Sequence, residues 1–388
     1  MSARLPPIAP SAAALGGSPY SGLVHRLAAY QGEVYPFHVG DTWMAPATGC
    51  RMEDLTEAEH PGMHKYTSVH GHPELLDACV EALRARTGVA ETRDEVLVTA
   101  GATGGLAAVA GALVAPGSEV LILAPFWPLI AGMVRAFHGT PVPVPVVGDI
   151  DQPEALREVL EAARTERTVA VYLNTPNNPT GYVLPRPMVE AVVAFARAHG
   201  LWVWSDEVYD QYVYEGEHVY ARALAPERTI SAYSFSKAYG MAGNRAGFLA
   251  GPKGALAAVR KISTHTFYST PTASQLAAAA ALRGGADAWV AHAAQAYATV
   301  GRAAAERLGV RAPQGSTFLW LDVADQLDPS DLHGSMDALL GRCVDRGILC
   351  APGRSFGPYP TRLRMCFTAA APEVTLRGVE ALAEVLGR

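Results

Sequence analysis

Residues 168–181 of this 388-residue chain read TVAVYLNTPNNPTG. The first part of the stretch is apolar or β-branched, a composition typical of a strand buried on both faces of a parallel sheet. A rigid turn rich in proline and asparagine ends it. A helical pattern over 188–199 and another apolar run over 201–204 follow the turn. The stretch therefore predicts a strand, a turn, a helix and a second strand.

The same alternation of apolar runs and helical patterns extends from about residue 90 to residue 285. Further helices are expected over 104–114 and from about 125 to 137, and further strands over 96–99, 119–123, 229–233 and 246–250. Because helices separate these short strands, the sheet should be mostly parallel and covered on both faces. The predicted fold class is α/β.

The pattern changes near residue 285. A long helix over 286–308 is followed by the strand 317–322, the helix 335–346, the strand 363–367 and the helix 372–386. This alternation predicts a smaller α+β domain, joined by the proline-rich N-terminal arm. We therefore expect a large domain over 46–285 and a small domain built from 1–45 and 286–388.

The composition limits the classes of function. Hydrophobic residues make up 49% of the chain and charged residues 18%, and the net charge of −6 offers no basis for binding nucleic acid. No apolar run reaches the roughly 20 residues that span a bilayer. The first ten residues lack a secretory signal pattern, so we expect a cytoplasmic protein without membrane contact. The five cysteines lack metal-ligand spacing, which predicts free thiols and no metal site.

Polar residues follow three of the predicted strands. The turn of the opening stretch contains Asn178, the run SDEVY contains Asp206 and Tyr209, and the run SFSK ends at Lys237, eight residues before Arg245. Taken singly, these residues are typical of a loop, a helix cap and a solvated lysine. However, the carboxyl ends of parallel strands form the edge where α/β proteins bind ligands. Together the residues therefore predict a site at that edge.

With their order kept, these motifs resemble the class I/II aminotransferases, the large fold-type I family of pyridoxal-phosphate enzymes. The resemblance covers residues 40–364, most of the chain. It implies a large domain with a mostly parallel seven-stranded sheet between helices, and a smaller α+β domain. It also implies that the chain transfers the amino group of an L-amino acid to a 2-oxo acid.

The resemblance assigns the catalytic roles to three residues. Lys237 is implied to form a Schiff base with pyridoxal 5′-phosphate and, once freed, to move a proton between the substrate α-carbon and the cofactor. Asp206 is implied to pair with the pyridinium nitrogen and keep it protonated. Tyr209, together with Asn178, is implied to hydrogen-bond the 3′-oxygen of the ring.

Further residues match the family's cofactor contacts. Gly101, Ala102 and Thr103 follow the strand 96–99 and open a helix, whose backbone N–H groups suit a phosphate. Ser234 and Arg245 match a hydroxyl and a guanidinium that bind this phosphate. Trp127 matches an aromatic residue that stacks on the ring, although it is also typical of a core tryptophan at a helix start. Tyr66 matches a tyrosine that reaches the phosphate of a neighbouring subunit, which implies a homodimer.

The substrate carboxylate requires a fork-shaped donor, and Arg364 matches the family's arginine for this role. Arg362 lies two residues earlier and on the same strand face, so the sequence leaves both open. Gly40 matches a backbone position that closes over the substrate. An aspartate-preferring branch of the family carries lysine at the position of Thr103, so its absence disfavours a dicarboxylic substrate bound by that route.

Two alternatives remain beside the aminotransferase. A pyridoxal-phosphate lyase, decarboxylase or oxidase of the same fold would share every cofactor residue. A short-chain NAD(P)-dependent dehydrogenase is suggested by the Gly101 turn and by Tyr233, which forms Tyr-x-x-x-Lys with Lys237. The third glycine of a dinucleotide-binding turn is missing, however, and Tyr233 ends an apolar run rather than lying in a helix. The dehydrogenase is therefore the more distant alternative.

Overall fold

The computed structural model describes residues 8–13, 15–17 and 20–388. Its main sheet has seven strands in the order β1-β7-β6-β5-β4-β2-β3, and every strand except β7 runs parallel to the others. The strands are β1 (Val96–Ala100), β2 (Glu119–Ala124), β3 (Thr140–Pro145), β4 (Thr168–Asn174), β5 (Trp202–Asp206), β6 (Thr229–Ser234) and β7 (Ala246–Ala250). The predicted α/β class and the seven-stranded sheet are confirmed.

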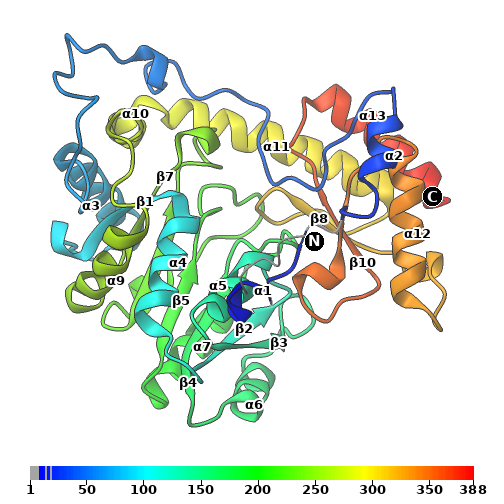
Figure 1. Cartoon of the computed structure of the whole chain (residues 1–388), viewed down its shortest axis with the longest axis horizontal. Coiled ribbons are helices and arrows are strands. Elements are labelled where there is room, and N and C mark those ends of the chain that lie inside the picture. The colour runs from blue at the N-terminus through cyan, green and yellow to red at the C-terminus, as the bar shows by residue number, and fades with distance from the viewer. Residues whose placement is uncertain (1–7, 14, 18–19) are drawn as a thin grey trace, which may run out of the picture.

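Helices cover both faces of this sheet (Figure 1). One face packs against α4 (Gly101–Leu113), α5 (Pro128–Ala136) and α9 (Lys253–Thr266). The other face packs against α6 (Pro153–Ala163), α7 (Arg186–Ala198), α8 (Ala221–Leu224), α3 (Pro73–Thr87) and α10 (Thr272–Ala280). In β2, Val120 and Ile122 join the first face while Leu121 and Leu123 join the second. Because successive side chains point to opposite covered faces, the strands read as continuous apolar runs.

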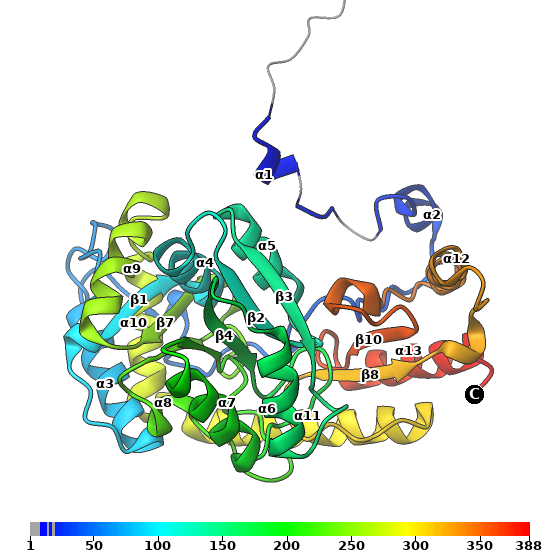
Figure 2. The same cartoon turned by 90° about the horizontal axis from the view of Figure 1, so that it is seen from below.

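A smaller antiparallel sheet has the order β8-β10-β9, formed by β8 (Phe318–Asp322), β10 (Arg362–Cys366) and β9 (Ala351–Pro352). It packs with α11 (Asp287–Leu308), α12 (Leu332–Val344) and α13 (Pro372–Val385). Phe37 lies in the same core, and Tyr35 forms a β-bridge with Ile348. Figures 1 and 2 show α11 running from beside the large sheet to the small one.

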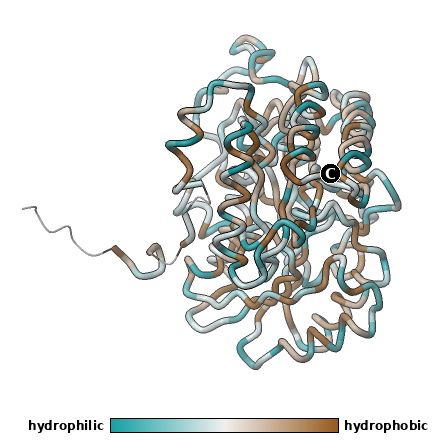
Figure 3. Tube along the Cα trace, turned by 90° about the vertical axis from the view of Figure 1, so that its right-hand side faces the viewer, coloured by the Kyte–Doolittle hydropathy of each residue, from teal (hydrophilic) through white to brown (hydrophobic). Residues whose placement is uncertain are grey.

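Short elements complete the described chain. They are α1 (Pro10–Ala13), α2 (Val24–Ala29), η1 (Met52–Asp54), η2 (Arg93–Glu95), η3 (Ala242–Asn244), η4 (Ala281–Gly285), η5 (Ala324–Gln326) and η6 (Gly353–Phe356). In Figure 3 the helices alternate between hydrophilic and hydrophobic segments, as expected where one helix face is buried. All five cysteines lie in the described chain, buried and without disulfides, as predicted. No helix among the described residues is long and apolar enough to cross a membrane.

Two differences from the sequence prediction have physical reasons. The edge strand β3 was not predicted, because its sequence TPVPVP carries three prolines. Proline is tolerated there, since an edge strand leaves one side of its backbone unpaired. Helix α4 begins at Gly101 rather than at residue 104, directly after β1. This direct junction places the first turn of α4 at the carboxyl edge of the sheet.

Candidate active site

The predicted site residues gather at one edge of the main sheet. The parallel strands β1, β4, β5 and β6 end there, and β7 begins there because it runs in the opposite direction. A cavity of about 1310 Å³ opens on this edge. Its lining includes Gly40, Ala102, Thr103, Trp127, Asn178, Asp206, Tyr209, Ser234, Lys237, Arg245 and Arg364. Residues far apart in the sequence are therefore brought to one place.

Asp206 forms the buried floor of the cavity at the end of β5, with 2% of its surface exposed. The Tyr172 hydroxyl donates to its Oδ2 at 2.7 Å, and the Val208 N–H donates to its Oδ1 at 3.4 Å. Burial raises the pKa of Asp206 to about 6, while these two hydrogen bonds act in the opposite direction. The protein thus holds the carboxyl in place. A positive charge beside it would favour its ionised form.

Lys237 lies shortly after β6, and its side chain reaches across the cavity to donate to the Gly40 carbonyl. The Tyr212 hydroxyl donates to the Lys237 carbonyl at 2.8 Å, which fixes the backbone at this turn. Burial lowers the pKa of Lys237, because the interior disfavours the charged amine. A neutral amine is the form that acts as a nucleophile or a base.

The start of α4 and Arg245 form a cradle for an anion. Gly101 has φ +66, and a β-carbon there would lie 2.6 Å from Arg245 Nη2. Only glycine therefore lets the guanidinium lie so close to this turn. The Arg245 backbone is itself left-handed, with φ 52, and its Nη1 donates to the Ala242 carbonyl at 2.8 Å. The first turn of α4 carries no acidic residue, so its N–H groups and dipole favour an anion.

Arg364 forms the opposite side of the cavity and is only 6% exposed. Its Nη1 donates to Asn178 Oδ1 at 3.0 Å, and its Nη2 donates to the His38 carbonyl. The guanidinium lies 4.3 Å from the ring centre of Phe318 and 4.8 Å from that of Phe356. Its buried Nε has no hydrogen-bond partner among the described residues. Burial lowers the pKa of Arg364 because the interior disfavours the charged guanidinium, and an anion beside it would offset this cost.

Arg362, the other arginine considered for this role, lies elsewhere. Its guanidinium pairs with Asp322 across the small sheet at 3.2 Å, and its side chain is 33% exposed. It does not appear among the described residues that line the cavity. Arg362 is the first residue of β10, and Arg364, two residues further along, reaches the cavity. The arrangement therefore favours Arg364 as the arginine for the substrate carboxylate.

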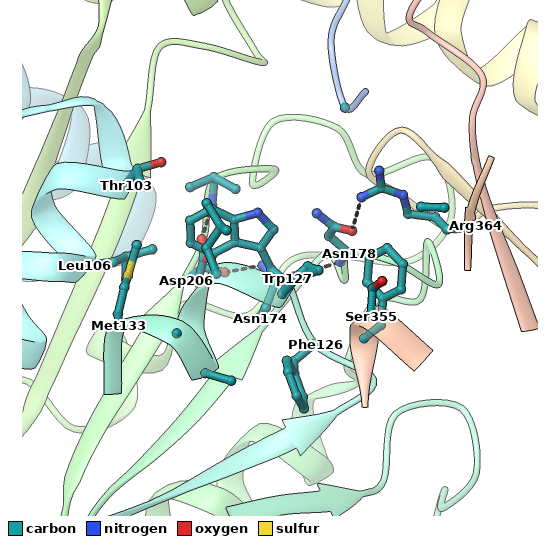
Figure 4. A pocket seen from close by; sticks show the side chains of 18 of the residues that line it. Thr103, Leu106, Phe126, Trp127, Met133, Asn174, Asn178, Asp206, Ser355 and Arg364 are labelled. Atoms are coloured by element: carbon teal, nitrogen blue, oxygen red, sulfur yellow. Dashed lines mark hydrogen bonds between the residues drawn. The ribbon is translucent and has the colours of Figure 1, made fainter. Parts of the chain in front are cut away.

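Figure 4 shows Thr103 on one side of the cavity and Arg364 on the other, with Asp206 and Trp127 between them. Tyr209 is also buried, and burial raises the pKa of its hydroxyl. A side chain at Gly40 would come within 2.8 Å of the Phe318 ring and 3.7 Å of the Tyr209 hydroxyl. The backbone at Gly40 therefore closes tightly over this end of the site.

Two predicted residues lie outside the lining. Gly101 lies next to the Arg245 guanidinium, which does line the cavity. Tyr66 is 89% exposed and makes an edge contact with Tyr268, with ring centres 5.3 Å apart. Within one chain it is not part of the cavity.

The prediction missed two residues that hold the floor of the site, of which Asn174 also lines the cavity. Tyr172 holds Asp206, and Asn174 donates from Nδ2 to the Asp206 carbonyl at 2.9 Å and accepts from the Asn178 N–H at 2.7 Å. Both lie on β4, whose register pairs Asn174 with Asp206. Their polar side chains in an apolar run were the available signal, but their partners follow only from the strand order.

Taken together, the fold and the cavity define an α/β protein in which the start of α4, the buried Lys237 and the buried Arg364 line one cavity. Comparison with known proteins identifies the family. Residues 35–382 match the family model for aminotransferase class I and II, so the chain belongs to that family and is a transaminase.

Individual relatives agree with this assignment. The chain is 33% identical over 335 residues to a probable aspartate/prephenate aminotransferase of Thermus aquaticus, covering 84% of each chain. It is 34% identical over 306 residues to an arginine–pyruvate transaminase of Pseudomonas aeruginosa, covering 76% of each. The structure of an aspartate aminotransferase double mutant of Thermus thermophilus superposes with a TM-score of 0.87 at 28% identity, covering 98% of this chain and 100% of that one. The fold is accordingly that of the fold-type I enzymes.

Proposed function

We propose that this aminotransferase carries pyridoxal phosphate at Lys237 and exchanges amino groups between an L-amino acid and a 2-oxo acid. One observation carries the proposal: Lys237 in the turn after β6, Asp206 at the end of β5 and Arg364 on β10 line the same cavity. The family model and the aminotransferase relatives support the same chemistry.

The residues present fit the cofactor. A phosphate would be held by the N–H groups of Ala102 and Thr103, by the Ser234 hydroxyl and by Arg245, where Gly101 leaves room for the guanidinium. Trp127 would cover the ring. When bound, pyridoxal phosphate supplies an electron sink that stabilises negative charge at the substrate α-carbon.

The chain's own groups position and move the protons. The Asp206 carboxylate would accept a hydrogen bond from the ring nitrogen, with Tyr172 holding the carboxylate in place. Asn178 and Tyr209 would donate to the ring's 3′-oxygen. The Lys237 amine, with its lowered pKa, would take the proton from the α-carbon, and the Gly40 carbonyl holds this amine in position.

Arg364 would bind the α-carboxylate of either substrate. Its unpartnered Nε and its Nη groups can form the fork-shaped contact, and Asn178 already orients the guanidinium. The flanking rings of Phe318 and Phe356 exclude water from the guanidinium faces, which strengthens its attraction for a carboxylate. Orientation at this point would fix the α-carbon near Lys237.

The assembly belongs to the same proposal. Two chains would form a homodimer in which Tyr66 reaches the phosphate site of the partner subunit. In support, the Tyr66 side chain is 89% exposed and does not line the cavity of its own chain. We also propose the division into a large domain, 46–285, and a small domain, 1–45 with 286–388. The contact of Tyr35 with Ile348 supports joining the N-terminal arm to the C-terminal part. The cytoplasmic location stays a prediction.

Half-reactions test the proposed function. The purified protein, loaded with pyridoxal phosphate, is mixed with single amino acids, and both the 2-oxo acid and the aminated cofactor are measured. We expect the two products in equal amounts. Release of ammonia, sulfide or carbon dioxide without the aminated cofactor would instead indicate an oxidase, a lyase or a decarboxylase.

A further inference from the structure

The cavity carries more positive charge than the proposed function uses, and this inference rests on that function. The described residues that line the cavity include four arginines and one lysine, but Asp206 is the only carboxylate among them. Lys237 would bear the cofactor, Arg245 would hold its phosphate and Arg364 would bind the α-carboxylate. Two arginines of the lining therefore have no role in the reaction as proposed.

These two arginines are Arg135 and Arg354. Arg135 is exposed, so solvent screens its charge. The Arg354 side chain is only 27% exposed, and its Nη2 donates to the carboxylate of Asp337. Its Nη1 is buried and has no hydrogen-bond partner among the described residues. Because a buried donor without an acceptor is unfavourable, the Arg354 guanidinium would gain from a further acceptor.

The backbone places Arg354 beside the proposed site for the α-carboxylate. Arg354 belongs to η6, where the Phe356 carbonyl accepts a hydrogen bond from the Phe126 N–H at 3.0 Å. The ring of Phe356 contacts the Arg364 guanidinium, and Ala351, three residues before Arg354, pairs with Arg364 in the small sheet. Both arginines therefore line the cavity from neighbouring segments of the small domain.

The surroundings of Arg354 suit a carboxylate. Ser355 lines the cavity as well, and Figure 4 shows it on the same side as Arg364. Its hydroxyl can donate a further hydrogen bond. Asp337 is 59% exposed and is not among the described residues of the lining, so it contacts the Arg354 guanidinium from outside the cavity. Such a partly exposed ion pair contributes little to stability, and it holds the guanidinium without placing an anion in the cavity.

We propose that Arg354 binds a second carboxylate, on the side chain of the amino-acid substrate, and that Ser355 donates to the same group. The substrate is then a dicarboxylic amino acid, with its α-carboxylate at Arg364 and its distal carboxylate at Arg354. Hydrogen bonds between a guanidinium and a carboxylate are charge-assisted, which makes them stronger than those to an uncharged amide. This route does not use Thr103, where the aspartate-preferring branch of the family carries lysine.

A substrate panel with the wild-type holoenzyme tests the assignment. The value of kcat/KM is measured for aspartate and glutamate and for their amides, asparagine and glutamine, which have nearly the same shape without the distal charge. We expect at least one acid to exceed its amide by about tenfold or more, as the loss of a charge-assisted bond requires.

Two other outcomes of the panel are distinguishable. If both amides match or exceed their acids, or if only other amino acids such as alanine, leucine or arginine react, the second carboxylate site is overturned while the proposed function stands. If no amino acid yields a 2-oxo acid, the proposed function is overturned and this inference with it.

A pair of variants separates substrate binding from a structural role of the ion pair. In Arg354→Gln the charge is lost, so kcat/KM should fall about tenfold more for the acids than for the amides. Asp337→Asn is the matched control, because it breaks the same ion pair and keeps the guanidinium. Its kcat/KM for the acids should stay within about threefold of the wild-type value. Equal losses for acids and amides in Arg354→Gln, or a loss for the acids in Asp337→Asn as large as in Arg354→Gln, would overturn the assignment.

Binding of unreactive analogues gives a test without turnover. Calorimetry with the holoenzyme compares succinate, which has two carboxylates, with succinamate, in which one carboxylate is replaced by an amide. We expect succinate to bind the wild type at least about fivefold more tightly, and this preference should disappear in Arg354→Gln. Equal affinities of the wild type for the two analogues, or an unchanged preference in Arg354→Gln, would overturn the inference.

Discussion

The Tyr172 hydroxyl donates a 2.7 Å hydrogen bond to Oδ2 of Asp206 from the neighbouring strand. Both side chains are buried, and the tyrosine packs edge-on against Trp204, with ring centres 5.7 Å apart. The hydroxyl favours the ionised carboxyl and fixes one of its oxygens, while the other accepts a hydrogen bond from the Val208 N–H. Tyr172 therefore positions Asp206 from beneath the site.

Removal of this hydroxyl should weaken cofactor binding. In Tyr172→Phe the carboxylate loses a hydrogen bond of about 1.5–3 kcal/mol, so affinity for pyridoxal phosphate should fall roughly tenfold or more. Equilibrium titration of the cofactor-free protein measures this. Tyr233→Phe is the matched control, since Tyr233 is equally buried in the same sheet but packs on its opposite face. Equal affinities in the two variants would show that Tyr172 does not act through Asp206.

Cofactor binding should depend on the ionisation of Asp206. Below about pH 6 its carboxyl takes up a proton and can no longer pair with a protonated ring nitrogen, so affinity should fall as the pH drops through this range. Asp206→Asn should bind weakly and lose this component of the pH dependence. Titrations between pH 5 and 8 compare the two proteins; identical pH profiles would contradict the assignment.

The same pKa has a consequence for the cofactor-free protein. Because burial raises the pKa of Asp206 from 3.8 to about 6, the folded state binds the proton more tightly than the unfolded state does. The free energy of unfolding should therefore fall as the pH rises from about 4 to 6, by at most about 3 kcal/mol. Denaturant unfolding of Asp206→Asn should lack this decrease, and a decrease of the same size in the variant would refute it.

Substitution of the two arginines of β10 should have very different effects on kcat/KM. In Arg364→Lys the fork-shaped donor is replaced by a single ammonium, so kcat/KM for amino acids should fall about 100-fold. Arg362→Lys alters only a partly exposed ion pair with Asp322 and should stay within about twofold. Initial rates with one amino acid suffice for the comparison. Comparable losses would mean that the carboxylate is not bound at Arg364.

Gly101 offers a test of the anion cradle. In Gly101→Ala the β-carbon would press on Arg245 in a left-handed backbone, so stability should fall by about 1–2 kcal/mol and cofactor affinity should fall as well. Gly117→Ala is the matched control. Gly117 also has a left-handed backbone, with φ +86, but a β-carbon added there would have no heavy atom within 4 Å. That variant should lose stability and keep the affinity. If the two variants bound pyridoxal phosphate with equal affinity, Arg245 would not belong to the phosphate site.

Much of this arrangement was accessible from the sequence. Continuous apolar runs predict a sheet covered on both faces, and polar residues at the strand ends predict the site edge. Asp206 follows from the end of β5 in this way, whereas the role of Arg245 was implied by the family resemblance. The direction of β7 was not predicted, because a strand of five apolar residues has the same pattern in either direction. That direction is what brings Arg245 to the edge.

Other features depend on the packing of distant segments. The carbonyl of Gly40 holds the Lys237 amine across 197 positions of sequence, and no local pattern predicts such a contact. Tyr172 reads as an ordinary strand residue until β4 and β5 are known to be neighbours. The choice between Arg362 and Arg364 likewise required the position of Asp322 on β8.

The central claim is that Lys237 bears the cofactor, and covalent trapping tests it most directly. The protein is incubated with pyridoxal phosphate, reduced with borohydride, digested and analysed by mass spectrometry, while absorbance is recorded before reduction. We predict a visible absorption band in the wild type and a phosphopyridoxyl group on Lys237 alone, with both lost in Lys237→Ala. A label on another lysine, or an unchanged band in Lys237→Ala, would contradict the account.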